Sequence, residues 1–221
     1  SGSFTLNALG AGSTFSASLS EVIIGTGTSG WTISMADEVS NVDITLIQFS
    51  AGGSYTGTGK AEVISAHSTS LDETMDTFTF DFRDDGVADT LAWTMDGSAT
   101  DQALVILKNF QGSAAATNND TLDINNGSSG TIYATSIGFF TAAQLLSSAL
   151  GETVTSANLT EVANTESGGT NSSMYTYAGD TYYLGYNSGG TGTLGSGDVI
   201  FKFVGTTDVN YGDIAGGHAD V

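Results

Sequence analysis

The stretch 104–124 reads LVILKNFQGSAAATNNDTLDI and shows in miniature the pattern of the whole chain. Its first four residues are apolar and predict a buried strand, and the small polar residues after Phe110 predict a loop. The stretch ends in a second apolar pattern that carries Asp120 and Asp123. Apolar strand, small-residue turn and aspartate recur along the chain, so the sequence predicts an all-β protein.

Alternation of apolar and polar residues is the strongest secondary-structure signal. It occurs over 78–82 and over 91–95, which we interpret as the two limbs of a hairpin within 71–103. Such alternation, with turn residues every few positions, is typical of an antiparallel β-sandwich or a β-rich two-part architecture. A second hairpin is expected around residues 178–180, and a last strand over 198–204.

One short helix is expected at about 141–150. The segment TAAQLLSSALG offers Thr141 as N-cap, leucines on one face and Gly151 as the terminating residue.

The composition restricts the classes of partner. The chain has 221 residues, with 24 acidic and 4 basic residues and a net charge of −20. Nucleic-acid binding requires basic residues that neutralise phosphates, so we expect no nucleic-acid partner. No run approaches the ~20 apolar residues of a membrane span. Cysteine and proline are absent, and 30 glycines must therefore make the turns.

Charge is distributed unevenly along the chain. Residues 1–70 carry five acids and one lysine, and the other 19 acids lie in 71–221. This asymmetry indicates two regions with different surfaces, and we place the domain division between 1–103 and 104–221. The strand-like pattern of residues 1–19 could pair with the sheet edge of a neighbouring subunit. The expected interface residues there are Phe4, Leu6, Phe15 and Leu19.

The aspartates around residue 85 form the first candidate metal site. Asp84, Asp85 and Asp89 flank Gly86, and Asp81 lies just upstream. Calcium prefers six to eight hard oxygen ligands, which closely spaced carboxylates on a glycine-kinked loop can supply. The alternative is an exposed acidic turn.

Two further groups are weaker candidates for calcium. One comprises Asn119, Asp120 and Asp123, which could equally hydrogen-bond backbone amides at a strand entry. The other comprises Asp180 and Asp198, with Asn187 between them.

We expect no enzymatic activity. The two histidines, His67 and His218, lie in polar stretches, and no G-x-S-x-G, H-E-x-x-H or phosphate-binding loop is present. A fragment of a secreted hydrolase would need a nucleophile beside His67. The tyrosines Tyr175, Tyr177 and Tyr182 have two interpretations, cross-strand packing and a subunit interface.

Residues 75–221 resemble the C-terminal regions of RTX-type bacterial proteins exported by type I secretion. The resemblance is carried by Val105-Ile106, Asn109-Phe110, Asp120–Ile124, Asp198, Val199, Phe203, Gly205 and Asp213-Ile214. The terminal Asp220-Val221 is similar to the export signal of such proteins. The glycine-aspartate nonapeptide repeats are missing, so the resemblance does not extend to their parallel β-roll and its calcium stack.

The resemblance implies an extracellular or cell-surface location in a bacterium. Together with the acidity and the lack of a catalytic pattern, it leads to one expected function. This is a secreted, calcium-stabilised structural protein that self-assembles into a filament or an S-layer. The alternative is a monomeric calcium-dependent adhesin or carbohydrate-binding module. The expected partners are copies of the chain and, as a further candidate, a cell-surface polysaccharide.

Overall fold

A computed structural model describes the positions of most strands and of one long helix. The described residues are 3–6, 14–17, 21–24, 31–35, 42–49, 52–57, 59–68, 75–83, 86–95, 102–112, 119–126, 137–164, 172–185, 192–195 and 198–215. Within them, sixteen strands form two facing sheets, here called sheet A and sheet B.

Sheet A is parallel throughout the residues described. In spatial order it contains β1 (Ser3–Leu6), β3 (Glu21–Ile24), β5 (Val42–Phe49), β7 (Glu62–Ser68), β9 (Thr90–Met95), β11 (Thr121–Asn126) and β16 (Ile214–Ala215).

Sheet B begins as a parallel sheet and becomes antiparallel. Its parallel part contains β2 (Thr14–Ala17), β4 (Trp31–Met35), β6 (Gly53–Thr56), β8 (Asp76–Asp81), β10 (Ala103–Lys108) and β15 (Val199–Val204). Its antiparallel part adds β14 (Asp180–Gly185), β13 (Met174–Tyr177) and β12 (Thr160–Glu161).

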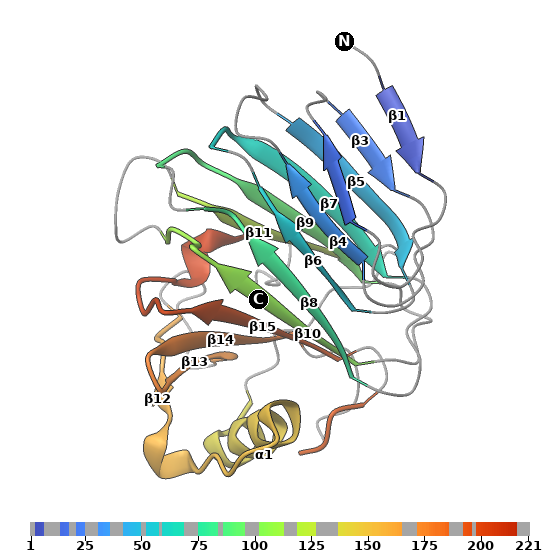
Figure 1. Cartoon of the computed structure of the whole chain (residues 1–221). Coiled ribbons are helices and arrows are strands. Elements are labelled where there is room, and N and C mark those ends of the chain that lie inside the picture. The colour runs from blue at the N-terminus through green and yellow to red at the C-terminus, as the bar shows by residue number, and fades with distance from the viewer. Residues whose placement is uncertain are drawn as a thin grey trace.

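Successive strands alternate between the two sheets up to β11, so the chain winds as a two-sheet coil (Figure 1). Each turn of the coil adds one parallel strand to each sheet. The register steps in sheet A are 18 (Ser3 to Glu21), 22 (Glu21 to Asp43), 20 (Asp43 to Val63), 27 (Val63 to Thr90) and 31 (Thr90 to Thr121). Because the turn length changes with every coil, the sequence shows no repeat of fixed period.

The all-β class and the sandwich-like pair of sheets are confirmed. The antiparallel direction is wrong outside β12–β15, and so is the predicted hairpin over 71–103, since β8 and β9 lie in different sheets. The error has a physical cause. Parallel sheets are usually buried on both faces and lack alternation, whereas the described residues of sheet A and of β4, β6 and β8 in sheet B bury one face and leave the other at least partly exposed. Period-two alternation indicates that one face of a strand is exposed to solvent, and it does not indicate whether neighbouring strands run parallel or antiparallel.

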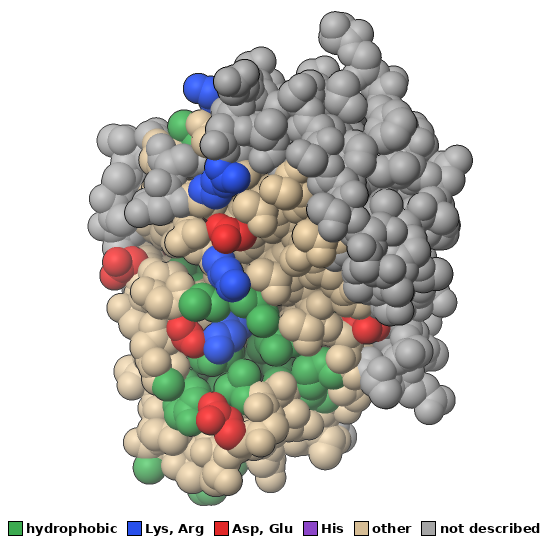
Figure 2. All heavy atoms as spheres, viewed as in Figure 1, with side chains coloured by type: hydrophobic (Ala, Val, Ile, Leu, Met, Phe, Trp, Pro, Cys, Tyr) green, Lys and Arg blue, Asp and Glu red, His purple; other side chains and the backbone are tan. Residues whose placement is uncertain are grey.

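A helix packs on the outer face of sheet B. Helix α1 (Phe139–Leu150) packs its Leu145 and Leu146 against a cluster that includes Leu104, Ile200 and residues of β13 and β14. Hydrophobic side chains gather on the lower part of this face (Figure 2). The predicted helix is confirmed, but it begins two residues earlier than expected. Gly138 is the N-cap, and Gly151 at φ 66° ends the helix as predicted.

The hairpin predicted around residues 178–180 is confirmed as the β13–β14 pair. Both Ala178 and Gly179 have positive φ, 52° and 88°, which matches a two-residue turn compatible with the strand twist. The strand predicted over 198–204 is confirmed as β15.

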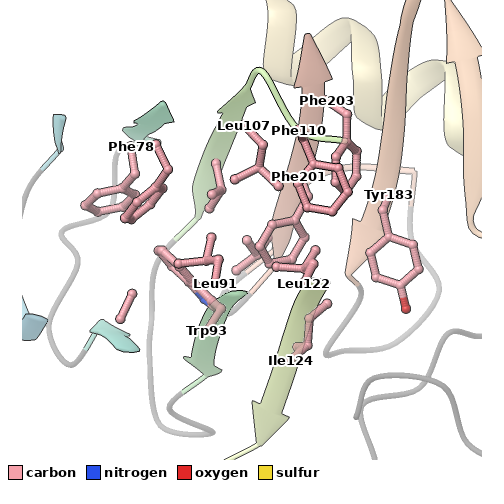
Figure 3. Close-up of a cluster of buried hydrophobic side chains, with 14 of the residues drawn as sticks. Phe78, Leu91, Trp93, Leu107, Phe110, Leu122, Ile124, Tyr183, Phe201 and Phe203 are labelled. Carbon is pink, nitrogen blue, oxygen red and sulfur yellow. The ribbon is translucent and has the colours of Figure 1, made fainter. Parts of the chain in front are cut away.

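The main core lies between the inner faces of the two sheets and is rich in aromatic rings (Figure 3). Trp93 of sheet A lies 5.4 Å from Phe78 and 6.0 Å from Phe201, measured between ring centroids. Phe110 and Phe203 continue the stack with centroids 4.7 Å apart. The alternating phenylalanines and the alternating Leu91 and Trp93 thus face each other across the sandwich.

The boundary predicted between 1–103 and 104–221 falls at the start of β10. This strand pairs with β8 on one side and with β15 on the other. The two predicted regions therefore share sheet B. No helix among the described residues is long and apolar enough to cross a membrane.

Candidate functional site

A column of three acidic residues lies where strands enter sheet A. The register aligns Val63, Thr90 and Thr121. The residues immediately before them, Glu62, Asp89 and Asp120, therefore stand in one row across three coils, and each side chain is at most 2% exposed. We call this set the carboxylate column.

The column is held by hydrogen bonds between neighbouring coils. Asp120 accepts one bond from the Asp89 backbone N–H at 2.9 Å and another from the Gln111 N–H at 2.7 Å. Asp89 in turn accepts a bond from the Glu62 N–H at 2.8 Å. Asp89 and Asp120 thus each satisfy a backbone donor of the preceding coil, which would otherwise be costly to bury.

Glu62, at one end of the column, lies near Tyr55 of β6. Burial raises the pKa of the Tyr55 hydroxyl far above its usual value, and the nearby Glu62 carboxylate raises it further. The tyrosine therefore stays protonated at physiological pH. Tyr55 of sheet B and Glu62 of sheet A are therefore close enough to interact electrostatically at this corner of the coil.

The first predicted metal group is divided between the two sheets. Asp81 ends β8 in sheet B, where it accepts bonds from the Arg83 N–H and, at 2.7 Å, from Asn109 Nδ2. Asp89 belongs to the carboxylate column at the start of sheet A. Asp84 and Asp85 lie outside the described residues.

The second predicted group is split by the pleat of β11. Asp120 points inward with Leu122, whereas Asp123 is half-buried on the opposite face. Neighbouring positions of odd separation face opposite sides of a sheet, so a spacing of three cannot bring two strand carboxylates together. Asn119 is half-buried beside the column.

The third group lies at opposite ends of one strand pair. Thr181 pairs with Phe203 and Gly185 pairs with Val199, which places Asp180 and Asp198 a strand length apart. Asp180 forms a 3.0 Å ion pair with Lys202, and Asp198 accepts a bond from the Gly195 N–H. Asn187 is outside the described residues. In the part of the chain that the structure describes, no three His, Cys, Asp or Glu side chains are grouped as metal ligands.

The predicted interface residues fall into two groups. Tyr175 and Tyr182 are each 1% exposed in the cluster beneath α1, which is the packing alternative, and Tyr177 is half-buried beside them. Phe4 and Leu6 lie in β1 and Phe15 lies in β2, the last strands of their sheets. Leu19 is outside the described residues.

Four basic residues that were not predicted as a site lie in a row across sheet B, here called the basic row. Lys60 follows β6, Arg83 follows β8, Lys108 ends β10 and Lys202 lies in β15, and these are consecutive neighbours in sheet B. Figure 2 shows Lys and Arg side chains in a line down one face. The signal in the sequence was the spacing of 23 (60 to 83) and 25 (83 to 108) residues, which is close to one coil.

Hydroxyl groups cover the outer face of sheet B beside this row. Thr32, Ser54 and Thr79 are aligned across β4, β6 and β8. The Ser54 hydroxyl donates to the Thr32 hydroxyl at 3.4 Å. This part of the face is flat, polar and suited to hydrogen bonding, in contrast to the apolar part under α1.

Comparisons with known proteins find no match for this chain among family models, curated proteins or solved structures.

Proposed function

We propose that this protein is a secreted structural protein of a bacterial surface, exported by type I secretion. It assembles with copies of itself into an extracellular filament or layer, and calcium stabilises that assembly. The observation that carries the proposal is the difference between the two ends of the coil.

The N-terminal end is an open parallel edge within the described residues. β1 is the last strand of sheet A and β2 is the last strand of sheet B, and each has one strand neighbour there. The unpaired backbone groups of such an edge form a template on which another strand can pair. This supports the hypothesis that residues 1–19 contact a neighbouring subunit.

At the other end, sheet A is only partly covered. The two-residue β16 pairs with Leu122 and Asp123, so Ile124–Asn126 of β11 have no partner on that side among the described residues. Sheet B instead ends in the two-residue β12, and α1 packs on its outer face. Short edge strands are a common way of limiting edge-to-edge association.

These ends fit each other in a head-to-tail arrangement. If β1 of one copy pairs with the part of β11 that β16 leaves open in the next copy, Ile124–Asn126, sheet A continues as a parallel sheet from subunit to subunit. Such a contact joins two different surfaces, and a heterologous contact that does not close into a ring produces an open filament.

Proline scanning of β1 tests this contact. In a strand, successive residues direct their N–H groups to opposite sides, so one of Phe4→Pro and Thr5→Pro removes an outward donor and the other removes one bonded to β3. We expect the outward variant to fold, as judged by circular dichroism, and to form no filaments in electron micrographs. Thr160→Pro in the β12 edge is the matched control and should assemble normally. Unchanged filaments from both β1 variants would exclude this edge as the contact.

The hydroxyl-bearing face of sheet B favours a second candidate, the monomeric calcium-dependent adhesin or carbohydrate-binding module. A flat array of Ser and Thr hydroxyls can hydrogen-bond sugar hydroxyls. This candidate requires single particles in electron micrographs with calcium, together with retention on immobilised cell-surface polysaccharide. Filaments or sheets without such retention favour the structural role.

A further inference from the structure

We propose that the basic row is the lateral contact between assembled copies, and that it receives an acidic face of a second copy of this chain. The inference rests on the proposed self-assembly and adds to it a second, electrostatic contact on the side of the coil. It is separate from the backbone contact at the coil ends.

The row runs along the axis of the coil. Thr56 pairs with Asp81, Asp81 with Lys108 and Lys108 with Val204, so the strand ends that carry the row follow one another at about 4.8 Å per strand. Two acids, Asp81 and Asp180, lie within the row and reduce its charge. The row nevertheless holds all four Lys and Arg side chains of a chain whose net charge is −20.

The side chains of the row are presented outward to different degrees. Lys60 and Lys108 are exposed, and Arg83 is half-buried. Lys202 is fixed by its ion pair with Asp180 and lies 5.6 Å from the centroid of the Tyr182 ring. Burial disfavours its charged form, but the hydrogen bond to Asp180 outweighs this and raises the pKa of Lys202. Lys202 is thus charged at neutral pH.

The charge distribution identifies the partner. The chain has four Lys and Arg residues in total, and all four belong to the row. The 24 acidic residues have no Lys or Arg outside the row to balance them, so an acidic surface away from the row on a second copy is complementary to it. Row against row would oppose like charges, so the contact joins unlike faces. Where such a contact is heterologous, it extends from copy to copy.

The lateral contact also reduces the electrostatic repulsion between copies. Copies with a net charge of −20 repel one another when they are packed side by side. A cationic row that meets an acidic face replaces part of that repulsion with attraction. Because exposed charges are screened by salt, the contact should weaken as ionic strength rises.

Replacing basic residues of the row with uncharged glutamine tests the inference. Arg83→Gln with Lys108→Gln removes two cations, and Ser148→Glu with Ala157→Glu is the matched control that shifts the net charge equally at exposed sites on and after α1. Lateral association is measured by sedimentation on the β1 proline variant that blocks filaments, and by the width of filament bundles in electron micrographs of the otherwise unaltered chain.

We expect the first pair to weaken lateral association about 2- to 30-fold, the range for two exposed ion pairs, and to leave single filaments in place of bundles. The control pair should retain bundles. Raising NaCl from ~0.01 to ~1 M shortens the screening length from ~30 to ~3 Å and should disperse the bundles.

Three results would overturn the inference. The first is unchanged lateral association in the Arg83→Gln, Lys108→Gln protein while filaments form, which leaves the proposed function standing. The second is association that EGTA abolishes and these substitutions do not alter, since calcium would then bridge acidic faces. The third is capture of an acidic polysaccharide by the row in a chain that does not associate with itself laterally. A chain that forms neither filaments nor layers under any condition instead refutes the proposed function.

Discussion

Removing the Asp120 carboxylate should cost a large part of the stability of the coil. In the Asp120→Ala protein, two buried backbone N–H groups, those of Asp89 and Gln111, lose their acceptor. A buried donor left unsatisfied costs about 1–3 kcal/mol, so the expected loss is about 2–6 kcal/mol. A domain is typically stable by only about 5–15 kcal/mol. Asp120→Asn keeps one acceptor oxygen and should cost about half as much.

The matched control is Asp123→Ala, three residues along the same strand. Asp123 is half-buried on the outer face, and substitutions at such positions usually change stability by no more than about 0.5 kcal/mol. Each variant removes one aspartate carboxylate, and the two carboxylates lie on opposite faces of the sheet at β11. They therefore separate the effect of the column from a general effect of charge.

The measurement is urea unfolding followed by tryptophan fluorescence, since Trp93 lies in the core. The midpoint should fall strongly for Asp120→Ala, less for Asp120→Asn and little for Asp123→Ala, with an unchanged m-value. Working in EGTA removes any contribution from bound calcium. Equal midpoints for Asp120→Ala and Asp123→Ala would refute the reasoning that the column holds neighbouring coils together.

Three further predictions concern other parts of the molecule. Burial raises the pKa of Tyr183 from 10.0 to about 12, so the stabilisation by its neutral hydroxyl is present below pH 10 and is lost as the pH rises to 12. Tyr183→Phe should therefore reduce the alkaline loss of unfolding free energy by about 3 kcal/mol in unfolding curves recorded at increasing pH. An unaltered pH dependence would contradict the burial argument. Ala178 is exposed at φ 52°, a backbone angle that asparagine tolerates better than alanine. Ala178→Asn should therefore raise the free energy of unfolding by up to about 1 kcal/mol, measured from the urea midpoint, whereas Ala178→Val should lower it. Calcium at 100 times its dissociation constant should stabilise the native chain by about 2.7 kcal/mol, and equal melting temperatures with and without EGTA would remove calcium as a structural cofactor.

Local patterns were sufficient for the elements of this fold. The phenylalanines of β8, the Leu91 and Trp93 alternation of β9, the glycine that ends α1 and the turn at Ala178 and Gly179 were all legible in the sequence. Each depends on residues within a few positions of one another, where side-chain periodicity and backbone preference act directly.

The candidate sites were less predictable because they depend on partners far along the chain. The spacing of Asp120 and Asp123 suggested a shared ligand set, but the pleat of β11 separates them. The actual neighbours of Asp120 are the N–H groups of Asp89, 31 residues earlier, and of Gln111. Coil length determines such pairings, and it changes from one turn to the next.

The sequence by itself determined an acidic, proline-free and cysteine-free all-β chain, and the location of its one long helix. Only the tertiary structure decided that most strands run parallel in two sheets, that Glu62, Asp89 and Asp120 form one buried column, and that the four basic residues form one row. The physical reason is that strand alternation records which face is buried, whereas direction, register and neighbours are set by backbone pairing between coils 18 to 31 residues apart.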